Sequence, residues 1–135
     1  MKRLIVTADD FGLAPAVNEA VEQGHRRGIL SAASLMVAGP AATDAVARAK
    51  RLPKLGVGLH LVLVDGRPVL PPAELPDLVG PDGRLIADPF RAGVKIFCNR
   101  DARWQMEREM RAQLDRKSTR LNSSHTSVSR MPSSA

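Results

Sequence analysis

Apolar residues along the first half of the chain recur in two patterns. Three short, nearly continuous apolar runs, at residues 2–8, 29–38 and 56–63, are typical of buried strands in a parallel sheet. Between them, residues 15–28 and 41–52 have apolar positions at helical spacing, with basic residues near their ends. A β-α-β-α-β order with short links predicts an α/β fold with parallel strands and right-handed crossovers.

The second half of the chain has a different composition. Between residues 64 and 83, glycine and proline are too dense for regular elements, and we expect a long functional loop there. Residues 89–97 suit a short helix or an irregular segment, and residues 100–114 predict a charged helix. Glu107 and Glu109 are expected on the solvated face of that helix.

Two adjacent carboxylates, Asp9 and Asp10, directly follow the first predicted strand, just before a glycine turn. Because parallel strands end at the same edge of a sheet, His60 is expected to approach both of them from the third strand. Two carboxylates and an imidazole have the composition of a divalent-metal site. Two structural alternatives stay open: an Asp here can cap the following helix, and a histidine in an apolar strand can be a satisfied core residue.

Composition limits the class of protein. A chain of 135 residues predicts one domain, although a β/α barrel typically needs about 250 residues. No apolar run is long enough for a transmembrane segment, and the basic start turns acidic too soon for a signal peptide, so we expect a cytoplasmic protein. Cys98 is the single cysteine, which excludes an internal disulfide, and we expect it to be a half-buried apolar residue.

The net charge of +6 raises the possibility of a polyanion partner. Half of that charge lies in residues 115–135, and elsewhere the basic residues are mixed with acids and lack interleaved aromatic residues. We therefore expect no nucleic-acid partner. A small basic module that binds nucleic acid or an anionic membrane is kept as an alternative.

Five short motifs stand out along the chain: TADDFGL at residues 7–13, VNEA at 17–20, SLMV at 34–37, GLHL at 58–61 and VLVDGRPVLPP at 62–72. With these motifs the chain resembles the YdjC-like family of carbohydrate deacetylases. The last motif resembles the family members associated with hopanoid biosynthesis.

The resemblance implies a distorted β/α (TIM-like) barrel that hydrolyses the acetamide of an N-acetylated sugar or glycolipid. It also implies a divalent metal, Mg²⁺ or Zn²⁺, held by an aspartate and two histidines. By resemblance Asp10 is the metal-ligating aspartate, His60 is the first histidine ligand and Asp9 is the general base. An exchange of roles between the two aspartates stays open, as does a different metal-dependent hydrolase such as a phosphoesterase.

The resemblance ends near residue 114. We expect residues 1–114 to be the N-terminal portion of the barrel and residues 115–135 to be a non-native, disordered tail, because the tail is serine-rich and resembles a translated sequencing adapter. The second histidine ligand is then absent from this chain, and His125 in the tail does not replace it. We expect this chain to be inactive by itself, and the full-length protein to be a possible homo-oligomer.

Overall fold

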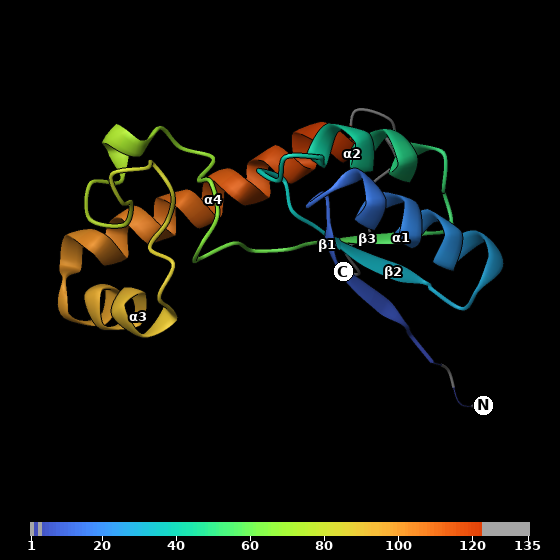
Figure 1. Cartoon of the computed structure of the whole chain (residues 1–135), viewed down its shortest axis with the longest axis horizontal. Coiled ribbons are helices and arrows are strands. Elements are labelled where there is room, and N and C mark those ends of the chain that lie inside the picture. The colour runs from blue at the N-terminus through green and yellow to red at the C-terminus, as the bar shows by residue number, and fades with distance from the viewer. Residues whose placement is uncertain (1, 3, 123–135) are drawn as a thin grey trace, which may run out of the picture.

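The computed structural model describes residue 2 and residues 4–122 (Figure 1). Three strands alternate with two helices, and a loop-rich segment then leads to two further helices. In chain order the elements are β1 (Thr7–Phe11), α1 (Pro15–Arg27), β2 (Ala32–Leu35), α2 (Ala42–Lys50), β3 (Gly56–Leu59), the 3-10 helix η1 (Pro72–Glu74), α3 (Pro89–Cys98) and α4 (Arg100–Asn122).

The strands form one parallel sheet in the order β1-β2-β3, which confirms the predicted β-α-β-α-β arrangement. Side chains of α1 and α2 pack on one face of this sheet and form the first core with Ala33 and Leu35 of β2. On the strands, residues of this packed face alternate with more exposed ones: Asp9 is exposed and Ser34 is half-buried. The sheet therefore has an apolar packed face and a polar open face.

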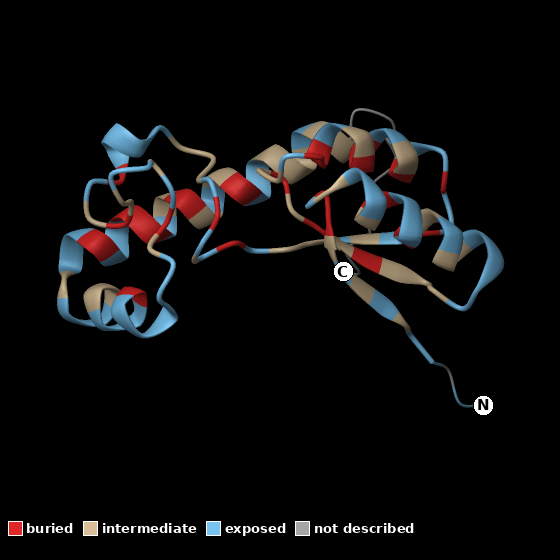
Figure 2. Cartoon of the chain, viewed as in Figure 1, coloured by how far each residue is buried: buried red, intermediate tan, exposed pale blue. Residues whose placement is uncertain are grey.

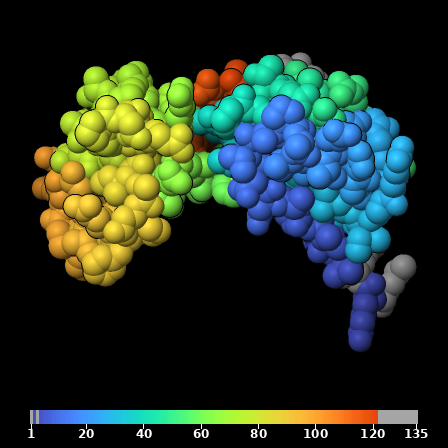
Figure 3. Space-filling model, in the orientation of Figure 1, coloured from blue at the N-terminus to red at the C-terminus, as the bar shows by residue number. Residues whose placement is uncertain are grey.

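A second core lies beneath the loop after β3 (Figure 2). It consists of apolar residues from that loop and from α4: Val62, Leu75, Leu78, Leu85, Ala102 and Met106. Helix α4 extends from this core to the first one, where it contacts α2 and where Leu121 packs. The two parts form separate lobes in Figure 3, and α4 joins them.

The first strand differs from the prediction. Residues 2–8 were expected to be a buried strand, but β1 begins at Thr7, and Leu4 and Ile5 are 80% and 76% exposed. The reason is the register of the sheet, because β2 starts opposite Thr7 and offers no partner to the residues before Val6. Asp9 and Asp10 consequently lie inside the strand and not after it.

Helix α4 corrects two expectations. It continues to Asn122, so the prediction of disorder is wrong for residues 115–122, where Leu121 anchors the last turn against the first core. Residues 123–135 lie outside the described residues, and the non-native origin of residues 115–135 stays a prediction. Glu109 was expected in solvent but is completely buried.

The buried polar residues of α4 form hydrogen bonds with the loop-rich segment. Gln105, Glu109 and Gln113 follow one another at intervals of four residues and bind the backbone of the irregular segment between residues 62 and 77. This segment lacks strand partners, so its N–H groups need other acceptors. The buried polar stripe of α4 supplies them.

None of the helices in the described part of the chain is long and apolar enough to cross a membrane.

Candidate active site

The two aspartates of β1 lie in a β-bulge. Ala8 pairs with Ala33 and Phe11 pairs with Leu35, so Asp9 and Asp10 together oppose the single residue Ser34. Asp10 has a φ of 60°, in the left-handed region that non-glycine residues seldom occupy. In a regular strand, adjacent side chains point to opposite faces. The extra residue removes this alternation, and both carboxylates reach the open face of the sheet.

Contacts on this face connect three strands. The Ser34 hydroxyl donates to Oδ1 of Asp9 at 2.7 Å and lies 3.1 Å from Nδ1 of His60. The same imidazole nitrogen lies 3.6 Å from Oδ1 of Asp10 and 3.4 Å from its backbone nitrogen. The expected approach of His60 to the two carboxylates is confirmed, directly for Asp10 and through Ser34 for Asp9.

The two structural alternatives, an aspartate that caps α1 and a histidine that belongs to the core, fit the structure less well. The residue that caps α1 is Ala14, and no side chain accepts a hydrogen bond there, so neither aspartate caps the helix. His60 directly follows β3, and its side chain is 28% exposed and borders polar groups. It is therefore not a core residue.

The turn after Asp10 is held by a buried asparagine. Asn18 accepts a hydrogen bond from the N–H of Gly12 at 2.7 Å, and its amide donates to the carbonyl of Ala41 and to Asp44. Gly12 has a φ of 104°, and a Cβ on Gly39 would lie 2.4 Å from the Gly12 oxygen. The turns after β1 and β2 therefore touch backbone to backbone, which requires glycine at both positions.

An ionic network extends from Asn18 along the outer side of α1 and α2. Arg48 donates to Asp44 at 2.9 Å and to Glu22 at 2.7 Å, and Arg26 also pairs with Glu22. The amide of Asn18, and then Arg48, lower the pKa of Asp44 below its ordinary value. Arg26, and then Arg48, lower the pKa of Glu22.

Replacing Arg48 with methionine is expected to make the loss of stability at acid pH less steep. The folded-state pKa values of Asp44 and Glu22 are lowered. The two carboxylates therefore stabilise the folded protein above their ordinary pKa values of 3.8 and 4.5, and this stabilisation is lost as the pH falls below those values. Urea unfolding at a series of pH values measures this slope. Arg27→Met, a change at an exposed position, is the control, and an unchanged slope in Arg48→Met would mean that the network does not contribute.

The donor set fits a divalent metal in part. The 3.6 Å between Oδ1 of Asp10 and Nδ1 of His60 is close to the spacing of about 3.4 Å between two ligand atoms of a tetrahedral zinc ion. Within the described ranges, however, no three His, Cys, Asp or Glu side chains are grouped to hold a metal ion. The other histidine of these ranges, His25, contacts the carbonyl of Leu30. Asp10 and His60 thus supply two suitable ligands of an incomplete set, and their role as ligands stays a prediction.

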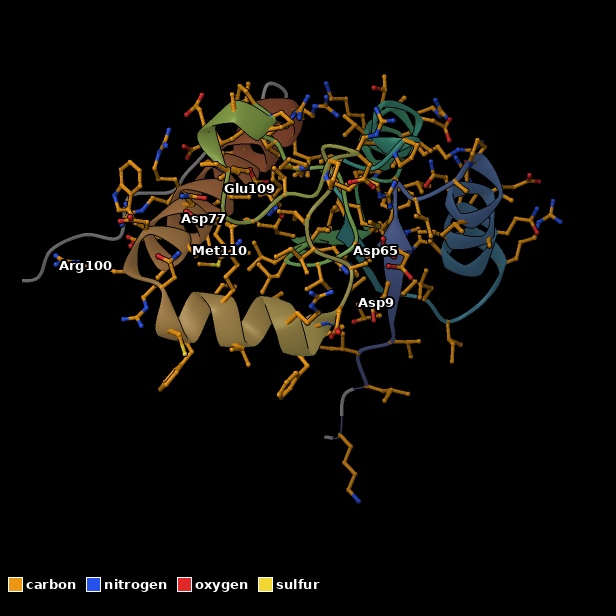
Figure 4. All side chains as sticks on the ribbon, turned by 60° about the vertical axis from the view of Figure 1, so that its left-hand side comes forward. Asp9, Asp65, Asp77, Arg100, Glu109 and Met110 are labelled. Carbon is orange, nitrogen blue, oxygen red and sulfur yellow. The ribbon has the colours of Figure 1, made fainter. Side chains whose placement is uncertain are left out.

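A cleft of about 190 Å³ lies where the two lobes meet. Leu13 and Met36, from the turns after β1 and β2, form one side, and the loop after β3 forms the other with Asp65, Arg67 and Arg84. Arg84 donates to the backbone oxygen and the carboxylate of Asp65. Figure 4 shows Asp9 on β1 and Asp65 on that loop. The cleft provides space for a ligand at the carboxyl ends of the strands.

Sequence reasoning missed two residues of the site, Ser34 and Asn18. Both lie in the short motifs at residues 17–20 and 34–37, but their roles depend on a bulge and a turn that no apolar pattern predicts. A polar residue within a small, apolar strand was the signal for Ser34. An amide one turn after a glycine turn was the signal for Asn18.

Comparisons with known proteins match most of the chain. Residues 3–124 match the family model described as YdjC-like protein. The chain is 40% identical over 129 residues to a carbohydrate deacetylase of Brevibacillus brevis, which covers 91% of this chain and 49% of that protein. It is 40% identical over 112 residues to a carbohydrate deacetylase of Geobacillus stearothermophilus, covering 83% and 42%. The chain thus spans about half the length of these relatives.

A solved structure matches the fold with a TM-score of 0.72 and 28% sequence identity, over 86% of this chain and 43% of the other. It is a protein from Enterococcus faecalis V583, provisionally named a cellobiose-phosphate cleavage protein. The expected fold, an α/β arrangement that forms part of a β/α barrel, is confirmed.

Proposed function

This chain belongs to the YdjC-like protein family, and from that membership we propose that it forms part of a metal-dependent carbohydrate deacetylase. The observation that supports the proposal most is the convergence of Asp9, Asp10 and His60 on the open face of the sheet, in a segment that is 40% identical to a carbohydrate deacetylase. The reaction would hydrolyse the acetamide of an N-acetylated sugar and release acetate.

Each residue of the site has a proposed role. Asp10 and His60 would hold a divalent metal, Mg²⁺ or Zn²⁺, together with a ligand from outside the described residues. Such a metal, when bound, polarises a carbonyl oxygen and lowers the pKa of bound water. Asp9 would accept a proton as general base, and Ser34 would orient its carboxylate through the 2.7 Å hydrogen bond.

The substrate class is part of the proposal. A sugar carried by a hopanoid lipid is the proposed substrate, because the motif at residues 62–72 resembles that of hopanoid-associated family members and lines part of the cleft between the lobes. Because the relatives are about twice as long as this chain, we propose that the activity belongs to a longer protein and that this polypeptide alone is inactive. A cytoplasmic location and homo-oligomers of the longer protein stay predictions.

In a longer protein that continues this chain as its relatives do, Asp10→Ala is expected to lower acetate release by at least about a hundredfold. The assay measures acetate from N-acetylglucosamine derivatives at a saturating concentration of Mg²⁺ or Zn²⁺. Asp101→Ala, at an exposed aspartate of α4, is the matched control and should keep full activity. Phosphate esters are assayed in parallel, and their preferential hydrolysis would favour a phosphoesterase. Acetate release by the 135-residue chain itself would contradict its proposed inactivity.

A further inference from the structure

Helix α3 presents an apolar face that no other described element covers. Phe90, Val94 and Phe97 follow at intervals of four and three residues, and they are 79%, 46% and 79% exposed. On the opposite side of the helix, Ala92 is buried and Ile96 packs against the second core. The core therefore holds one face of α3 and leaves a second apolar face in solvent.

The exposed face is continuous. Two shallow grooves run along α3, and Phe90, Val94 and Cys98 line both of them. Cys98 is itself exposed, so the expectation of a half-buried cysteine is wrong, because its position on α3 faces away from the core. Figure 4 shows the outer side chains of α3 pointing away from the rest of the molecule. Contiguous exposed apolar surfaces of this kind mark interaction sites.

Basic side chains border this face. Residues 88–103 contain four basic and two acidic residues, and α3 itself contains no acid. Arg91 of α3 is exposed, and Arg103 donates to the carbonyl oxygens of Ile96 and Phe97 at the end of the helix. Arg100 lies at the end of α4 that adjoins α3 (Figure 4). The aromatic residues are thus flanked by cations.

We propose that α3 docks on the surface of a lipid bilayer that contains anionic lipids. Phe90, Val94 and Phe97 enter the boundary between headgroups and acyl chains, and Arg91 and Arg100 face the lipid phosphates. The charges favour this occupant over a second copy of the chain, because a two-fold interface would gather Arg91 and Arg100 of both copies around one apolar surface. A ten-residue helix is only about 15 Å long, which is also small for a stable dimer interface.

This inference goes beyond the proposed function, because it concerns the surface that the protein binds and not the bond that it hydrolyses. If the proposed substrate is a glycolipid, α3 brings the enzyme to the surface that carries it. The docking can be tested without any activity assay, so a failure of either proposal is recognised separately.

The test is co-sedimentation of the full chain with vesicles of phosphatidylcholine alone or mixed with phosphatidylserine. We expect binding to the mixed vesicles only, weakened about tenfold or more in the double variant Phe90→Ser, Phe97→Ser. Ile29→Ser is the matched control, since Ile29 is 77% exposed on the other lobe. Arg91→Gln with Arg100→Gln should also weaken binding and reduce its salt dependence.

Three results would overturn the docking proposal. The first is the absence of binding to either vesicle, by this chain or by a longer protein that continues it, which in the longer protein would assign the face to the continuation of the chain. The second is binding that both phenylalanine changes leave intact, which would indicate adsorption through charge alone. The third is a dimer, detected by analytical ultracentrifugation, that dissociates in the phenylalanine variant, which would assign the face to a second copy. Far-UV circular dichroism verifies that every variant keeps its helices.

Discussion

Replacement of Glu109 by alanine is expected to lower the free energy of unfolding by about 2–4 kcal/mol. The carboxylate is completely buried and accepts hydrogen bonds from the backbone N–H groups of Val69 and Leu70 at 2.8 and 2.9 Å. It also accepts a bond of 2.8 Å from the amide of Gln113. Alanine removes all three acceptor contacts and leaves a void in the second lobe. Urea or thermal unfolding measures the loss, which is a large part of the stability of a typical domain.

Two further variants make this result specific. Glu109→Gln keeps the size of the side chain but retains one oxygen acceptor, so it should lie between the wild type and the alanine variant. Glu107→Ala is the matched control on the same helix, because Glu107 is exposed and pairs with Arg111 one turn away. Exposed pairs of this kind contribute little. Equal losses in Glu107→Ala and Glu109→Ala would contradict a role for burial.

Asn18→Ala is expected to cost about 2–4 kcal/mol and to loosen the turn that positions Asp10. The amide is completely buried, and its removal takes from the N–H of Gly12 its hydrogen-bond acceptor and from the carbonyl of Ala41 one of two donors, the other being the N–H of Ala45. Unfolding experiments measure the stability. The backbone amide signals of residues 10–12 in NMR spectra should broaden or shift, whereas those of α4 should not.

Asn18→Asp separates shape from hydrogen-bond chemistry. It keeps the acceptor for Gly12 but places oxygen against the Ala41 carbonyl and a second negative charge against Asp44. We therefore expect it to be at least as destabilising as alanine, although it is nearly isosteric. Gln23→Ala is the control on the same helix, since the Gln23 amide is exposed and bonds to Glu19. A stable Asn18→Asp protein would mean that the amide donors are dispensable.

Local pattern and chain topology explain why much of the fold could be predicted. Parallel strands that alternate with helices must end at one edge, and this alone brought His60 toward the aspartates across fifty residues. Helix α1 has the predicted bounds because Pro15 starts it and Gly28 follows its last basic residues. These features depend on neighbours in the sequence or on a general rule of connection.

The features that could not be predicted depend on distant partners. Glu109 looks like a solvent-facing residue of a charged helix, and only the unpaired backbone of residues 69 and 70 makes it a buried acceptor. The bulge at Asp9 and Asp10 is a matter of register with β2, which hydropathy does not reveal, so the sequence pattern predicted both carboxylates after the strand and not inside it. The end of α4 depends on Leu121 meeting the first core.

Mutations on the two faces of the sheet are expected to have different effects. Ala33 and Leu35 of β2 are held in the first core, whereas the Ser34 hydroxyl between them contacts Asp9 and His60 on the open face. A change at Ser34 therefore alters the polar site while the packing beneath it stays the same. Such a strand can evolve new chemistry on one side without a loss of foldability on the other. The bulge extends this freedom to two successive positions of β1, which makes this short edge strand an adaptable part of the protein.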